Sequence, residues 1–411
     1  MKVGILSLGC PRNLVDSESI LARLARKGHT ITDINRAEIG IINTCAFIND
    51  AKEESIEAIL DLIELKKSGK LKKIIVHGCL SQRYKSKLVK ELPEIDAFVG
   101  RVSLNHEKST YRITPRHFAY LKICESCVNN CSFCIIPKIK GKFNSLDMET
   151  LVDKAAELDR SNVKELNIIG QDISGYGLDL YGKIRLTELI KKILQNTKNI
   201  RWLRLLYLYP SRVTDELLKL VKNEERICKY IDLPVQHINS RILKLMRRRM
   251  DKVGILKTIN KIRKIVPQAA IRTSVIVGFP GETDKEFKEL LDFIKEAKFE
   301  RLGAFIYSAE EGTPAYKLRN RISPKVLSER FNAVMLIQQD ISREINSGFM
   351  GKELEVLIEE KDKDVYLGRS QFDAPEVDGM VYVKSKVALK PGDIKKVRIT
   401  DTYEYDLMGE A

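Results

Sequence analysis

Three short apolar runs in the first hundred residues each end at a cysteine, and a stretch with helical periodicity follows each run. The runs are VGILSLGC ending at Cys10, IGIINTC ending at Cys45 and IIVHGC ending at Cys79. Short runs rich in Ile and Val are typical of buried parallel strands. Residues 1–105 are therefore predicted to form a small parallel βαβ domain. The carboxyl ends of parallel strands share one edge, so the three cysteines are expected to converge there.

The same alternation resumes after a polar stretch at residues 105–116, which we interpret as a linker. Six apolar runs lie between residues 118 and 308, separated by helical segments such as 148–160 and 284–298. Six βα units predict an incomplete TIM-like barrel over residues 116–348, including a long helix near its end. Barrels of this kind place their chemistry at the carboxyl ends of the strands.

Short alternating strands separated by Gly and Pro turns occupy residues 349–411. This pattern predicts a small antiparallel β-barrel. The predicted fold class is thus α/β with three domains, in keeping with a chain of 411 residues, which exceeds the length of a single core.

Charged residues interrupt every apolar stretch before it reaches membrane-spanning length, and the N-terminus lacks the pattern of a signal peptide. We therefore expect a cytoplasmic protein without membrane association. Cytosolic thiols are kept reduced, so the eight cysteines favour metal or cluster ligation over a disulfide framework.

Cys127, Cys131 and Cys134 form a CxxxCxxC motif directly after the first run of the predicted barrel. Three thiolates can hold three irons of a 4Fe-4S cluster and leave the fourth iron open to S-adenosylmethionine. Phe133 lies beside the last cysteine and can pack on the adenine of that cofactor. The alternative is zinc, because Cys124 creates two CxxC pairs, but zinc ribbons separate such pairs by roughly 15–20 residues. We interpret Cys124 as a strand-end residue.

The strand-end cysteines Cys10, Cys45 and Cys79 have a simpler interpretation as small buried residues, since free cysteine is often buried. Cys228, which has no nearby Cys or His, is interpreted in that way. The common position of the other three in successive βα units favours ligation instead. Three thiolates without an obvious fourth ligand favour a second cluster over a closed zinc site, for which four ligands are usual.

Polar and small residues at two barrel strands are candidates for binding S-adenosylmethionine. Gln171 follows the second strand, Arg272 and Ser274 lie in the fifth, and Gly278 ends it. The loop from Gly278 also has the pattern of an entry into a capped helix, which is a structural alternative. The charge run at residues 247–249 lies on a predicted helix, and is either a solvated face or a substrate contact.

Taken together, the motifs resemble the methylthiotransferase family of radical enzymes over essentially the whole chain. They are the LGC, NTC and HGC cysteines, KICESCVNNCSFCIIP, RTSVIVGFPGET and EEGTPA. The resemblance implies an N-terminal domain with an auxiliary cluster, a radical barrel and a C-terminal TRAM domain. It also implies two 4Fe-4S clusters, held by Cys10, Cys45 and Cys79 and by Cys127, Cys131 and Cys134, and S-adenosylmethionine as methyl donor and radical source. Ser126 departs from the family, which usually has Gly there.

The family divides by substrate between adenosine beside the tRNA anticodon and an aspartate of the twelfth small-subunit ribosomal protein. LGCPRNLVDSE, LPVQH, SAEEGTPA and GRSQFDAPEVDG resemble the second group. The resemblance implies methylthiolation of the aspartate β-carbon, a flavodoxin- or ferredoxin-like electron donor, and tRNA as the alternative substrate.

The charge distribution favours the protein substrate. Residues 351–411 hold 10 Lys and Arg against 14 Asp and Glu, so the net charge of +15 comprises −4 here and +19 elsewhere. A loop with Asp373, Glu376 and Asp378 would repel phosphates and attract a basic ribosomal protein. A solvated turn is the alternative for this loop.

Overall fold

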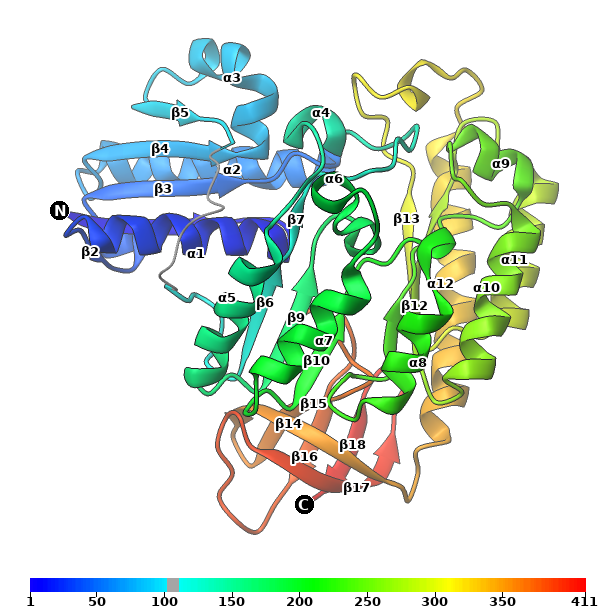
Figure 1. The fold of residues 1–411 in the computed structure, drawn as a ribbon. Helices are drawn as coiled ribbons and strands as arrows, with labels where there is room; N and C mark the ends of the chain where they lie inside the picture. Colours follow the sequence, from blue (N-terminus) through cyan, green and yellow to red (C-terminus); the bar gives the residue numbers. More distant parts are fainter. Residues whose placement is uncertain (102–110) are drawn as a thin grey trace. The chain divides into compact units, whose positions relative to one another are not determined.

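The computed structural model, drawn as a ribbon in Figure 1, describes residues 1–101 and 111–411. The chain divides into two units. The first comprises Met1–Thr114, Cys124–Leu146 and Ser308–Tyr316, and the second comprises Pro115–Ile123, Asp147–Tyr307 and Lys317–Ala411. Much of the linker predicted at residues 105–116 lies outside the described residues.

A parallel sheet with the strand order β2-β1-β3-β4-β5 organises the first unit. The predicted parallel βαβ architecture is therefore confirmed. Its strands and helices are β1 (Lys2–Ser7), α1 (Pro11–Arg26), β2 (Thr30–Ile31), β3 (Ile39–Thr44), α2 (Asn49–Lys67), β4 (Lys73–Gly78), α3 (Cys79–Glu91) and β5 (Ala97–Val99). The segment 124–146 adds β7 (Cys124–Glu125), α4 (Ile136–Lys140) and β8 (Asn144–Ser145).

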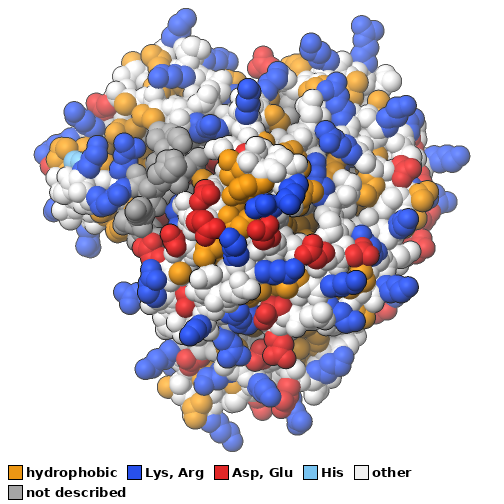
Figure 2. All heavy atoms as spheres, in the orientation of Figure 1, with side chains coloured by type: hydrophobic (Ala, Val, Ile, Leu, Met, Phe, Trp, Pro, Cys, Tyr) orange, Lys and Arg blue, Asp and Glu red, His pale blue; other side chains and the backbone are white. Residues whose placement is uncertain are grey.

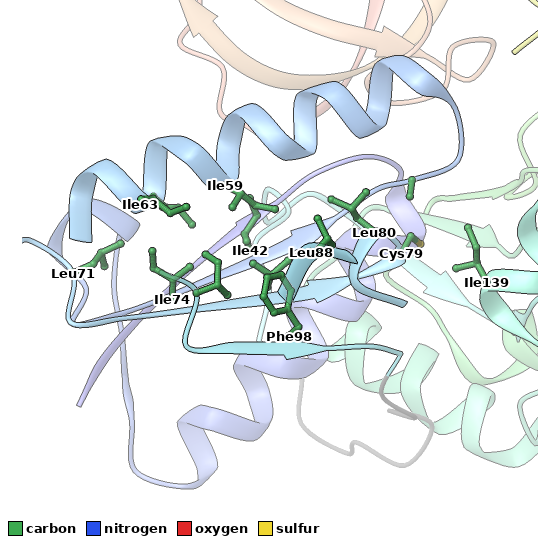
Figure 3. Packing of buried hydrophobic residues seen from close by; sticks show 14 of the residues in the cluster. Ile42, Ile59, Ile63, Leu71, Ile74, Cys79, Leu80, Leu88, Phe98 and Ile139 are labelled. Atoms are coloured by element: carbon green, nitrogen blue, oxygen red, sulfur yellow. The ribbon is translucent and has the colours of Figure 1, made fainter. Parts of the chain in front are cut away.

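The core of this unit lies between the sheet and α2. Figure 3 shows Ile59 and Ile63 of α2 above the strands that carry Ile42 and Ile74. Burying an isoleucine side chain contributes about 1.5–3 kcal/mol, which is why the apolar face of α2 stays on the sheet. Ile139 of α4 joins the same cluster, so the segment after the CxxxCxxC motif packs into the core of the N-terminal sheet.

Parallel strands form the incomplete barrel of the second unit. They build two sheets, β10-β9-β6 and β11-β12-β13, and the pair Leu203–Ile227 bridges them. The predicted incomplete barrel is thus confirmed. Its elements are β6 (Phe118–Lys122), α5 (Met148–Arg160), β9 (Glu165–Ile169), α6 (Leu178–Tyr181), α7 (Leu186–Asn196), β10 (Trp202–Leu205), α8 (Asp215–Asn223), β11 (Tyr230–Asp232), α9 (Ser240–Leu245), α10 (Lys252–Ile265), β12 (Ala270–Val277), α11 (Asp284–Ala297), β13 (Arg301–Ile306) and α12 (Pro324–Ser347).

Two local expectations in the barrel have different outcomes. The loop after Gly278 does enter a capped helix, because Thr283 and Glu286 form a capping box at the start of α11. The helix predicted for the charge run at 247–249 is wrong, since α9 ends at Leu245 and Arg247 has a φ of 55°. Arg248 instead stacks on the Tyr209 ring, with 4.1 Å between its Cζ and the ring centroid.

A closed barrel with the order β14-β15-β16-β18-β17 forms the C-terminal part of the second unit. Its strands are β14 (Glu353–Asp362), β15 (Val365–Ser370), β16 (Val381–Lys384), β17 (Ile394–Thr402) and β18 (Leu407–Glu410). The predicted small barrel is confirmed, with one correction: β16 and β18 pair in parallel, while the other pairs are antiparallel. Within the described residues, no helix is both long and apolar enough to cross a bilayer.

Candidate functional site

The strand-end cysteines of the first unit occupy three neighbouring positions of the sheet edge. Cys10 is the N-cap of α1, Cys45 directly follows β3, and Cys79 opens α3 directly after β4. Because β1, β3 and β4 are adjacent strands, the three cysteines leave the sheet side by side.

Asn13 ties the three cysteine loops together, and the sequence interpretation missed it. Its buried amide donates to the carbonyls of Leu8 and Thr44, each at 3.1 Å, and its Oδ1 accepts from the Cys79 thiol at 3.9 Å. A buried amide satisfied in this way fixes the loops, since losing one of its partners leaves a polar group unpaired. Its place in the LGCPRNLVDSE segment, three residues after Cys10, was the available signal.

Glycine at position 9 lets two of the cysteine loops approach. Gly9 has a φ of +87°, and a Cβ there would lie 2.7 Å from the Cys45 Cβ and 3.0 Å from its sulfur. The position therefore excludes a side chain for steric and conformational reasons.

We expect Gly9→Ala to lose the iron held by the first triad, because the added methyl group must push Cys45 away. Gly28→Ala is the matched control: Gly28 has a φ of +80° but has nothing within 4 Å of an added Cβ. In both variants, alanine must adopt a left-handed backbone conformation, which destabilises the folded protein by about 1–2 kcal/mol. Iron per chain after anaerobic reconstitution measures the difference, and equal iron in the two variants would contradict the steric argument.

The second triad lies on the loop between β7 and α4. Cys131 is buried, whereas Cys127 and Cys134 are partly exposed. The backbone and side-chain N–H groups of Asn129 donate to the Cys127 sulfur at 3.4 and 3.3 Å. Such N–H···S bonds stabilise negative charge on sulfur and tune cluster potentials.

Ser126 shows why glycine is usual before this triad. Its φ of 62° lies in the left-handed region, which costs a residue with a Cβ roughly 1–3 kcal/mol. The Ser126 hydroxyl donates to the carbonyl of Gly141 at 2.6 Å, which offsets part of that cost.

The electrostatics of the thiols differ within the first triad. Burial raises the pKa of Cys10, but the charge and N–H group of Arg12, 3.4 Å from the sulfur, leave that pKa below its ordinary value. Burial raises the pKa of Cys79 to about 12. In the second triad, burial likewise raises the pKa of Cys134 to about 12. A metal that binds these buried thiols must displace their protons.

One further segment of the first unit, Ser308–Tyr316, contacts the surroundings of both triads. Glu310, which is 2% exposed, pairs with Arg83 of α3 at 2.6 Å. The same Arg83 donates to the carbonyl of Ala46, next to Cys45, at 3.1 Å. At the other end, the Ala315 amide donates to the carbonyl of Ser132, inside the CxxxCxxC motif, at 2.8 Å. The EEGTPA motif thus links the two cysteine loops.

The donor sets fit iron–sulfur clusters. All six candidate cysteines are free thiols. In the described part of the chain, no three His, Cys, Asp or Glu side chains close around a single metal ion. A cubane places its thiolates on different irons, so they do not need to meet at one point. Cys228 is 1% exposed, as expected for a buried thiol, and Cys124, in the short strand β7, is equally buried.

The candidate residues for S-adenosylmethionine lie in both units. Phe133 belongs to the first unit and is partly exposed. In the second unit, the buried Oε1 of Gln171 has no hydrogen-bond partner among the described residues. A buried polar atom without a partner is costly, which suits a group that a ligand satisfies.

The other candidates have structural partners. Arg272 pairs with Asp232 at 3.3 Å and with Asp378 at 3.6 Å. Ser274 is partly buried on the same strand. Gly278 has a φ of +75°, and a Cβ there would lie 1.9 Å from the end of the Leu327 side chain of α12, so its backbone conformation already accounts for glycine.

The prediction that the acidic loop attracts a basic partner is wrong for Asp373 and Asp378, whose side chains are 3% exposed. Asp373 accepts from Arg301 Nε at 3.0 Å, and Asp378 accepts from the Tyr230 hydroxyl at 2.5 Å. Glu376 is exposed, but it accepts from the Tyr120 hydroxyl at 3.0 Å. These carboxylates bind the barrel, so their charge is not free to steer an external partner.

The basic charge of the chain is distributed rather than segregated on the face shown in Figure 2. Lys and Arg side chains are interspersed there with Asp and Glu. The charge argument against tRNA is therefore weaker than the sequence suggested.

Three family models match the chain in succession. The uncharacterized protein family UPF0004 matches residues 2–100, the radical SAM superfamily matches 121–294, and the TRAM domain matches 350–411.

Relatives of similar length match the chain from end to end. A ribosomal protein uS12 methylthiotransferase RimO of Clostridioides difficile is 48% identical, with 100% of this chain and 98% of the relative covered. The enzyme of the same name from a Thermoanaerobacter species is 47% identical, with 99% of each chain covered.

Solved structures with a similar fold have low sequence identity. The radical S-adenosylmethionine methyltransferase TsrM of Kitasatospora setae is 13% identical with a TM-score of 0.53, and the match covers 82% of this chain and 89% of TsrM. The cobalamin-dependent enzyme OxsB is 12% identical with a TM-score of 0.52, over 82% of this chain and 56% of OxsB. These likenesses concern the fold alone.

Proposed function

Because the chain belongs to the family of ribosomal protein uS12 methylthiotransferases, we propose that it transfers a methylthio group to the β-carbon of an aspartate on uS12. The full-length match at 48% identity carries the proposal. The radical SAM match includes Cys127, Cys131 and Cys134, and membership of that superfamily implies a 4Fe-4S cluster and S-adenosylmethionine.

In this proposal, the second triad holds the radical cluster with one iron open for S-adenosylmethionine. When bound at this triad, the cluster and S-adenosylmethionine would supply a radical able to take hydrogen from an unactivated C–H bond. The first triad, Cys10, Cys45 and Cys79, holds the auxiliary cluster that presents the sulfur. Both triads belong to one unit, which supports this assignment. Asn13 ties the three loops of the first triad together, and Ser308–Tyr316 links that triad to the second.

The remaining protein groups bind and orient the reactants. Phe133, Gln171, Arg272, Ser274 and Gly278 are the proposed contacts of S-adenosylmethionine, among which Gln171 has the clearest structural support, its buried unsatisfied oxygen. The electron needed to start the reaction is proposed to come from a flavodoxin- or ferredoxin-like donor.

The test incubates the anaerobically reconstituted full-length protein with reductant, S-adenosylmethionine and either a uS12 peptide or tRNA. We expect the aspartate peptide to gain the mass of a methylthio group in place of hydrogen, and tRNA to remain unchanged. A peptide with asparagine at the target position controls for modification elsewhere. Methylthiolated tRNA with an unmodified peptide would contradict the proposal and favour the tRNA alternative.

A further inference from the structure

Lys140 is a buried cation in the segment that follows the second triad. It is 5% exposed, ends α4, and lies six positions after Cys134. Lysine is rarely buried unless it is paired, because removing its ammonium from water costs several kcal/mol. Its burial therefore requires compensating charges nearby.

The compensating charges come from two carboxylates, one on the segment after Cys10 and one on the segment before Cys127. Asp16 of α1, six positions after Cys10, lies 3.2 Å from Lys140 Nζ. Glu125 of β7, two positions before Cys127, lies 3.7 Å from the same nitrogen. Lys140 thus forms ion pairs with one residue beside each triad, within a single unit.

Lys140 also shares a pocket with one cysteine of the first triad. Lys140 and Asp16 line a small pocket with His77, Cys79 and Arg101. Besides these residues, the pocket wall includes Gly78, Gln82 and Ile139. Lys140 and Cys79, a cysteine of the first triad, thus line the same pocket.

The backbone of Lys140 cannot move away from this position. Ile135, the N-cap of α4, and Ile139 within this helix are buried in the N-terminal core. Figure 3 shows Ile139 in that cluster. The next residue, Gly141, turns the chain with a φ of +76°. A lysine anchored at both ends acts as a fixed charge.

The charge balance shows what this fixed cation does. Asp16 and Glu125 are two carboxylates with side chains only 12% exposed, and the thiolates of a bound cluster would add further negative charge. Asp16 and Glu125 lie 3.2 and 3.7 Å from the ammonium, and opposite charges at such distances favour its charged form. The lysine therefore stays charged, and a cation beside a cluster favours its reduced, more negative form.

We propose that Lys140 is a positioning residue that holds the segment after Cys10 and the segment before Cys127 together. It also supplies a positive charge beside the auxiliary cluster, which makes that cluster easier to reduce. The inference rests on the proposed auxiliary cluster at Cys10, Cys45 and Cys79. It adds a residue that the sequence motifs did not single out.

The experiment compares Lys140→Met, Lys140→Arg and the double variant Lys140→Met with Asp16→Asn, each as reconstituted full-length protein. A Cys127→Ala background leaves the auxiliary cluster as the only redox signal, and EPR-monitored titration then gives its potential. We expect Lys140→Met to lower the potential and Lys140→Arg to restore it. The double variant removes one charge of each sign, so its potential should return toward the wild-type value. Lys138→Met, an exposed lysine of the same helix, should leave the potential unchanged.

A second readout in the Cys127-containing protein separates positioning from charge. Methylthiolated peptide per S-adenosylmethionine cleaved should fall about tenfold in Lys140→Met, the lower end of the effect of removing an outer-shell partner. It should stay low in the double variant, which lacks the ion pair to Asp16, and recover in Lys140→Arg.

The outcomes distinguish this inference from the proposed function. A wild-type protein that binds only one cluster would overturn the two-cluster proposal itself. Two clusters in the wild type, with an unchanged potential in Lys140→Met, would overturn the role of Lys140 alone. If Lys140→Met does not take up the auxiliary cluster, the double variant provides the test. A reduction potential of its auxiliary cluster that differs from the wild-type value would refute the charge argument.

Discussion

Cys10→Ala is expected to abolish methylthiolation and leave the reductive cleavage of S-adenosylmethionine intact, whereas Cys127→Ala is expected to abolish both. The reason is that each cysteine belongs to a different triad, and only the second triad leaves an iron open to S-adenosylmethionine. Cys10 and Cys127 are matched for this comparison because both are partly exposed, so their replacement disturbs packing least.

Iron content and product analysis measure this prediction together. Each variant should retain about half of the wild-type iron, since one of two clusters is lost. Product analysis then gives cleaved S-adenosylmethionine and modified peptide separately. Cys228→Ala, which removes a buried thiol outside both triads, should keep the full iron content. Wild-type methylthiolation by Cys10→Ala would exclude an essential auxiliary cluster.

Glu165→Ala is expected to destabilise the second unit by about 3–5 kcal/mol, the cost of breaking a buried ion pair from one side. Glu165 is fully buried at the start of β9, and it accepts from Arg204 of the radical barrel at 2.7 Å and from Arg369 of the C-terminal barrel at 2.5 Å. Without the carboxylate, two buried guanidinium groups lose their shared partner.

Thermal or urea unfolding of the full chain measures the loss as a lower midpoint of the second unit's transition. Glu355→Ala is the control: it removes an exposed ion pair between the same two barrels, with Arg201 and Glu355 3.9 Å apart. Exposed pairs contribute about 0–1 kcal/mol. Equal losses in the two variants would refute the importance of burial.

The pH dependence of this effect has a defined sign. Burial raises the pKa of Glu165, but Arg369 and Arg204 outweigh it and leave the pKa below its ordinary value of 4.5. A carboxyl group with a lowered folded-state pKa stabilises the protein fully above its unfolded-state pKa. That stabilisation is lost as the pH falls through the folded-state pKa. The difference in the free energy of unfolding between the wild type and Glu165→Ala should therefore be constant near neutral pH. It should become smaller below pH 4.5.

Periodicity and spacing determined the architecture because both are local properties of the chain. Alternating apolar runs and helical segments predicted the parallel sheet, the incomplete barrel and the small C-terminal barrel. They did not predict the parallel pairing of β16 with β18, since which strands become neighbours depends on how the barrel closes. The local pattern likewise misjudged residues 247–249, where α9 has already ended at Leu245 and Arg247 has a left-handed backbone conformation.

The sequence by itself also determined the six candidate cysteines, because thiol spacing and strand-end position are visible in a linear chain. Only the tertiary structure decided what surrounds them. Asn13 and Glu310 lie within quoted motifs and Lys140 lies outside them, but the linear chain indicated a role for none of the three. Each bridges segments that are distant in sequence. The acidic loop is a second example. Its composition suggested an exposed acidic patch, but Asp373 forms a buried ion pair with Arg301. A charge acts through the groups that folding brings to it, and composition does not name those partners.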